Sequence, residues 1–153
     1  MTYIDVLEAI AGKIAALWPD RMLYRDFCPT DHQRPSGFLY VQEAGYTDAN
    51  LGLVRWTFQA ELELFTATDA YDVESTEQLR KDQAAVLDQF GGPGLQVGDR
   101  FLLLQVTAET PGAGTAYVAF SASWMDSRPG YQDPETAAGP KMEHFVFRVN
   151  GKD

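Results

Sequence analysis

Residues 54–64 read VRWTFQAELEL, and this stretch decides the fold. From Val54 to Leu64, apolar residues occupy every second position and alternate with polar ones. An alternation of period two places all the apolar side chains on one face of a β-strand. The stretch therefore predicts a long strand with one face against a core. Its other face carries Glu61 and Glu63 and is expected to be solvated.

Two amphipathic helices are expected on either side of this strand in the sequence. Between residues 2 and 18 apolar residues recur at spacings of three and four, with Thr2 as the N-cap and Pro19 just past the end. The sequence STEQ at 75–78 fits a capping box for the second helix. The run GGPG at 91–94 stops that helix.

The remaining segments predict a sheet. Further strands are expected at 22–27, 37–42, 101–106, 115–125 and 143–149. Residues 45–50 are typical of a turn or loop, and residues 126–142, rich in Pro and Gly, form a long loop. The order of elements predicts a single α+β domain over residues 1–153. It consists of a mostly antiparallel sheet of about five to six strands flanked by two helices.

The composition limits the classes of function that the protein can have. The 153 residues include 22 acids and 12 bases, for a formal net charge of -10, so a basic surface that grips nucleic acid is not expected. The N-terminus lacks a basic region ahead of its apolar residues, and no apolar run approaches the length of a membrane span. We therefore expect an intracellular, soluble protein with no membrane partner.

Groups suited to catalysis are few. The two histidines, His32 and His144, stand in weak local contexts, and Cys28 is the single cysteine. These residues lack the paired spacings of a metal site, so neither a metal nor a cofactor is expected. An acid-base enzyme remains an alternative, for which Asp31, His32 and Glu43 are the least implausible ingredients.

A binding module is a second alternative. In it the sheet and helices would enclose an apolar pocket lined by Trp56, Phe120 and Trp124. These aromatics lie on apolar strand faces, which favours core packing over a base-stacking platform, since such a platform would also need basic neighbours on the same face.

Taken in order, the elements resemble the tail-terminator, or tail completion, proteins of long-tailed bacteriophages, over about residues 3 to 126. The carrying features are LWPD at 17–20, LYRD at 23–26, RPSGFLYV at 34–41, ELF at 63–65, Tyr71-Asp72 and VLDQF at 86–90. The segment 129–141 departs from the compact members of that family.

The resemblance implies a structural virion protein, assembled in the host cytoplasm and located in the tail. Its copies would form a hexameric ring that caps the tail tube, ends tube polymerisation and joins the tail to the head connector. Another head-tail connector or a tail tube component is a close alternative. DNA would pass through the ring without specific binding, and no cofactor or chemistry is implied.

Two groups of residues are singled out by this hypothesis. The acids expected to line the lumen are Glu61, Glu63, Asp69, Asp72 and Glu74. The residues expected to contact a neighbouring subunit or partner are Tyr46, Leu51, Phe65 and Tyr131.

Overall fold

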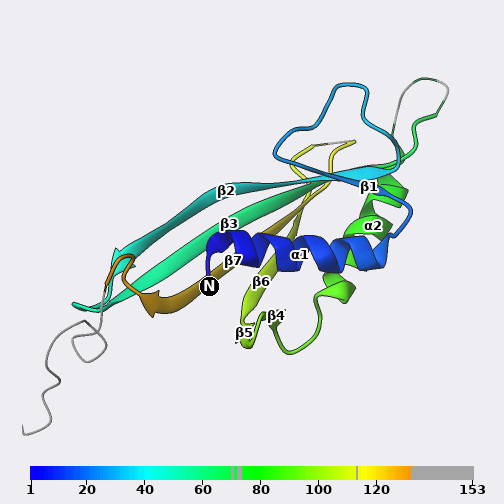
Figure 1. Ribbon diagram of the computed structural model, residues 1–153. Coiled ribbons are helices and arrows are strands. Elements are labelled where there is room, and N and C mark those ends of the chain that lie inside the picture. Colours follow the sequence, from blue (N-terminus) through cyan, green and yellow to red (C-terminus); the bar gives the residue numbers. More distant parts are fainter. Residues whose placement is uncertain (70, 72–73, 113, 132–153) are drawn as a thin grey trace, which may run out of the picture.

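A computed structural model describes residues 1–131 apart from 70, 72–73 and 113 (Figure 1). Its helices are α1 (Tyr3–Leu17) and α2 (Thr76–Gln89). The main sheet contains β1 (Met22–Arg25), β2 (Ser36–Asp48), β3 (Leu53–Phe65), β6 (Leu104–Glu109) and β7 (Tyr117–Ser127). A separate hairpin contains β4 (Leu95–Val97) and β5 (Arg100–Leu102). The predicted α+β class with a mostly antiparallel sheet is confirmed.

The strands of the main sheet lie in the order β1-β2-β3-β7-β6, so β3 is the central strand. Its pairs with β2 and β7, and the β6–β7 pair, are antiparallel. The β1–β2 pair is parallel, because residues 26–35 carry the chain back to the end of the sheet where β1 began.

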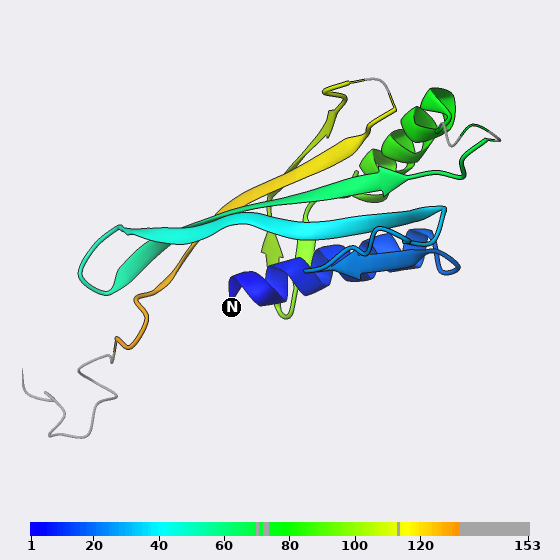
Figure 2. The same ribbon diagram turned by 90° about the horizontal axis from the view of Figure 1, so that it is seen from above.

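Both helices lie against the same face of the sheet, whereas the sequence placed them only as flanking elements. Figure 1 shows α1, α2 and the β4–β5 hairpin beneath the sheet, and Figure 2 looks onto the opposite face. The core on the helix side includes Phe58, Ala60 and Leu62 of β3 together with Ile10 of α1 and Val86 of α2. We call the opposite side the outer face.

The helix boundaries follow the predicted capping signals. Thr2 and Asp5 form a reciprocal capping box at the start of α1. The Ser75 side chain accepts a hydrogen bond from the Gln78 backbone at the start of α2, and α2 ends before the run at 91–94. Each cap satisfies backbone N–H groups that have no partner inside the helix.

The strands β2, β3 and β7 extend beyond the helices at one end of the molecule (Figure 1). We call this extension the arm and define it as residues 45–57 and 123–127. The prediction of a turn or loop at 45–50 is wrong for 45–48, which belong to β2, whereas 49 and 50 lie in the turn between β2 and β3. Tyr46 pairs with Trp56 across the strands and Trp56 pairs with Trp124, and the Trp56 and Trp124 rings stack at 6.0 Å. Cross-strand aromatic pairs of this kind stabilise the paired strands, and the buried Trp124 also joins them to the hydrophobic core.

Two other predicted boundaries change. The strand expected at 101–106 is divided between β5 and β6, because Leu102 packs into the core with the hairpin while Leu103 turns outward. Residues 126 and 127 belong to β7 instead of the long loop, and 132–142 and the terminal strand at 143–149 lie outside the described residues. Within the described part of the chain, no helix is long and apolar enough to cross a membrane.

The side chain of Gln83 fastens α2 to the sheet. Gln83 is buried, and its Nε2 donates hydrogen bonds of 2.9 Å to the backbone oxygens of Glu109 and Tyr117. We expect Gln83→Ala to lower the free energy of unfolding by about 1–3 kcal/mol, because it removes the donor for both carbonyls. Urea denaturation should show a lower midpoint with an unchanged slope. The exposed Gln105→Ala is the control, and an equal loss in both variants would contradict this role.

Candidate functional site

The outer face of the sheet carries two carboxylates side by side on β3. Glu61 and Glu63 are two positions apart and pair across the strands with Tyr40 and Phe38 of β2. Because alternate residues of a strand share a face, both side chains lie on the side away from the helices, as the sequence predicts. Figure 2 looks onto this face of β3.

Glu61 is buried, at 9% exposed, so the expectation that it is solvated is wrong. Its two oxygens have separate donors: Tyr40 Oη at 3.0 Å from Oε1, and Gln42 Nε2 at 2.8 Å from Oε2. A β-bulge between Val41 and Glu43 interrupts the β2 register beside this group. Donors from β2 therefore hold the carboxylate in place without a cation.

Glu63 lies in a less favourable environment for a charge. Burial is the main cause that raises the pKa of the Glu63 carboxyl, and the nearby Glu74 and Glu61 raise it further. A 3.4 Å hydrogen bond from Tyr117 Oη acts in the opposite direction. Burial also raises the pKa of the Tyr40 and Tyr117 phenols, which therefore remain protonated donors at neutral pH.

Glu74 differs from these two because it has a cationic partner. Arg34 forms an ion pair with Glu74 and donates to the Thr66 backbone oxygen at 3.1 Å. The second Glu74 oxygen accepts from the Thr66 backbone N–H at 3.3 Å. These contacts attach the chain after β3 to residues before β2, and they neutralise the Glu74 charge.

The five acids predicted to share a surface are only partly brought together. Glu61, Glu63 and Glu74 lie close enough for both other carboxylates to act on the pKa of Glu63. Asp69 accepts a hydrogen bond from the Tyr71 backbone at 2.8 Å. Asp72 lies outside the described residues. In the described part of the chain, no ion pair involves Glu61 or Glu63.

The predicted contact residues fall into two places. Tyr46 and Leu51 are exposed on the arm, at 47% and 85%, and Tyr131 lies beside Gly52 at the same end. Phe65 is at the other end of β3, half-buried with its ring 4.0 Å from that of His32. The arm therefore holds Tyr46 and Leu51, and Tyr131 lies next to it, so three of the four predicted contact residues are at one end of the molecule.

The ingredients of an enzyme are not assembled. His32 stacks on Phe65, and its Nδ1 lies 3.1 Å from the Pro29 oxygen. Asp31 is exposed. Ser36 of β2 pairs with Phe65, the residue on which His32 stacks, and Glu43 is seven positions further along β2. At about 3.3 Å per residue, Glu43 therefore lies roughly 23 Å from Ser36. His144 lies outside the described residues.

The described residues hold no cluster of His, Cys, Asp and Glu suited to a metal ion. Burial raises the pKa of the Cys28 thiol, with the Glu63 charge as the second cause. This effect disfavours the reactive thiolate.

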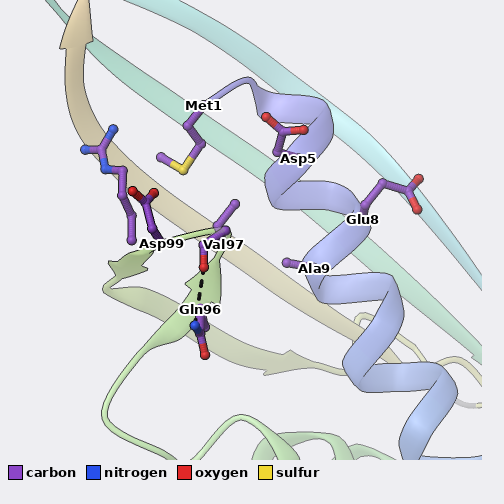
Figure 3. Close-up of a pocket in the computed structure, with 9 residues that line it drawn as sticks. Met1, Asp5, Glu8, Ala9, Gln96, Val97 and Asp99 are labelled. Atoms are coloured by element: carbon purple, nitrogen blue, oxygen red, sulfur yellow. Dashed lines mark hydrogen bonds between the residues drawn. The ribbon is translucent and has the colours of Figure 1, made fainter.

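The aromatics of the binding-module alternative serve packing instead. Phe120 and Trp124 are buried in the core, and Trp56 stacks on Trp124. A depression of about 620 Å³ lies elsewhere, between α1 and the β4–β5 hairpin (Figure 3). Its lining includes the charged residues Asp5, Glu8, Asp99 and Arg100, so it is more polar than a typical ligand pocket.

Comparison with known proteins assigns no family. No protein-family model matches the chain, and no curated protein is significantly similar to it.

The environment of Glu63 gives a testable pH dependence. Its pKa is raised in the folded state, so the native protein holds this proton at a pH where the unfolded chain has released it. This contribution to stability is present at low pH and is lost as the pH rises through the folded pKa. We expect Glu63→Gln to be more stable than the wild type at neutral pH, with a difference that shrinks as the pH falls.

Urea denaturation across the acidic to neutral range measures this difference. Glu77→Gln, on the exposed side of α2, controls for the loss of one negative charge. A Glu63→Gln protein that is less stable than the wild type at neutral pH would show that the carboxylate is stabilised where it lies.

Proposed function

We propose that this chain is a structural subunit of the tail-terminator type. About six copies form a ring that caps the tail tube, ends its polymerisation and joins the tail to the head connector. The protein would assemble in the host cytoplasm and reside in the tail of the virion.

The observation that carries this proposal is the arm. Its strands continue past both helices and expose Tyr46, Leu51 and Leu53, with Leu51 at 85%. An isolated subunit gains little from apolar side chains at the tip of a projection, whereas an assembled one buries them. A projection from each subunit that packs on the next makes a heterologous contact, and such contacts generate rings when the rotation closes.

The charges on the outer face are consistent with a ring whose lumen is lined by this face and lets DNA through. Glu61 and Glu63 have no ion pair among the described contacts, and the whole chain has a formal net charge of -10. Phosphate binding depends on Lys and Arg, and the outer face of β3 carries the two acids Glu61 and Glu63 against the single base Arg55. A lumen lined by this face would therefore hold DNA weakly. Glu74, which is neutralised by Arg34, contributes less to such a potential than the two β3 acids.

Light scattering over a concentration series, together with negative-stain images, tests the ring. We expect closed rings of about six copies in the wild type. Open-ended filaments would favour a tail tube component instead. A monomer at every accessible concentration would contradict the ring and favour the alternative of a binding module.

A substitution tests the arm. We expect Leu51→Asp to weaken assembly by roughly tenfold or more, because a central contact contributes on the order of 2 kcal/mol or above. Ile4→Asp is the matched control, since it places the same charge on an exposed apolar side chain outside the arm. Equal assembly by Leu51→Asp and the wild type would exclude the arm from the interface.

A further inference from the structure

The two edge strands of the main sheet each have one side without a partner strand. Among the described residues β1 pairs only with β2, and β6 pairs only with β7. Figure 2 shows β1 and β6 on opposite sides of the sheet. A free strand edge presents a row of backbone N–H and C=O groups that can pair with another chain.

The hydrophobic core reaches both edges and is incompletely covered at each. Leu23 of β1 and Leu104 and Val106 of β6 pack against the core but are only half-buried. Past the end of β1, Phe27 is 72% exposed, and just before β6, Leu103 is 80% exposed. Further apolar surface would be buried if something covered these edges.

The usual protection against edge pairing is weak at both strands. The β6 sequence LQVTAE contains no Lys, Pro or bulge. The one charged residue of β1, Arg25, forms an ion pair with Glu8 of α1 on the helix side. The Arg25 charge is therefore paired within the subunit and does not protect the free edge of β1.

The strand directions favour pairing between copies. β1 is parallel to β2, and the three antiparallel pairs from β2 to β6 make β6 run opposite to β2. When a second copy continues the sheet in the same orientation, its β1 therefore lies antiparallel to the first copy's β6. This arrangement places the end of β1, followed by Phe27, next to the start of β6, where Phe101 and Leu103 are exposed.

The pleat limits the register. Leu23 pairs with Gly37 and Tyr24 with Phe38, so Leu23 shares the helix side with Leu39, and Met22 and Tyr24 lie on the outer face. On β6, Val106 is opposite the core residue Phe120, which places Thr107 on the outer face. Opposed residues in one sheet must share a face, so Leu23 must meet an even-numbered residue of β6.

We propose that β1 of one copy pairs antiparallel with β6 of the next, with Leu23 opposite Val106 and Met22 opposite Thr107, to make one continuous sheet around the ring. This inference rests on the proposed function for closure of the ring. Each copy then uses both of its free edges. A two-fold dimer made from one kind of edge would leave the other edge and its apolar neighbours uncovered.

Disulfide trapping tests the pairing. In a Cys28→Ser background, the double variant Met22→Cys/Thr107→Cys is oxidised and run on a non-reducing gel. Opposed residues in an antiparallel pair lie about 4.5–5.5 Å apart between Cα atoms, within the range of a disulfide. We expect a ladder of covalent oligomers that ends at the number of subunits in the ring.

Three controls give the result its meaning. An equal mixture of the two single variants should give covalent dimers and no longer ladder, because each copy then carries one half of the pair. Each single variant alone should stay monomeric on the gel. The double variant Met22→Cys/Ala108→Cys should not crosslink, because Ala108 lies on the other face of β6.

The outcomes separate this inference from the proposed function. Rings without a ladder in the Met22→Cys/Thr107→Cys variant would overturn the edge pairing and leave the ring intact. Covalent dimers of a single variant would overturn it in favour of a two-fold dimer. The absence of both rings and crosslinks would overturn both proposals.

Discussion

The one-sided burial of β3 is the constraint on which the rest of the structure depends. This strand pairs with β2 on one side and β7 on the other, so its register fixes both neighbours. Its buried residues, among them Phe58, Leu62 and Leu64, form the surface on which both helices pack. Because the helices take the same side, the alternation along β3 leaves the opposite side to polar contacts between strands.

The features proposed to act in assembly all follow from this two-layer arrangement. A sheet covered on one side has a free face, where Glu61 and Glu63 are held by phenols and an amide instead of by cations. A sheet longer than its helices has an arm, and an open sheet has two edges. Face, arm and edges point in different directions, so one subunit can make separate contacts with neighbours and leave the face free.

Much of the fold could be predicted because its signals are local. The Thr2 and Ser75 caps and the alternation at 54–64 each act within a few residues. The errors arise from contacts between distant residues. The continuation of β2 to Asp48 depends on the pairing of Tyr46 with Trp56, and the burial of Glu61 depends on Tyr40 and Gln42.

The site could be predicted to the same extent. The spacing of two placed Glu61 and Glu63 on one face, whereas the pairing of Glu74 with Arg34 joins residues 40 positions apart and has no local signal. Nothing in the spacing of polar residues indicates which acids meet a base once the chain has folded. The identity of the two edge strands could likewise not be predicted from the sequence, since the order of strands depends on pairing between distant segments.

The alternation along β3 also places neighbouring residues under two different kinds of selection, one on core packing and one on surface charge. A substitution at Leu62 changes the volume of the core and is limited by the helices that pack on it, whereas a substitution at Glu63 changes the charge of a surface that no helix covers. Neighbouring codons in one strand can therefore evolve at different rates and for different reasons. Substitutions on the outer face can therefore change its electrostatic potential without changing the fold.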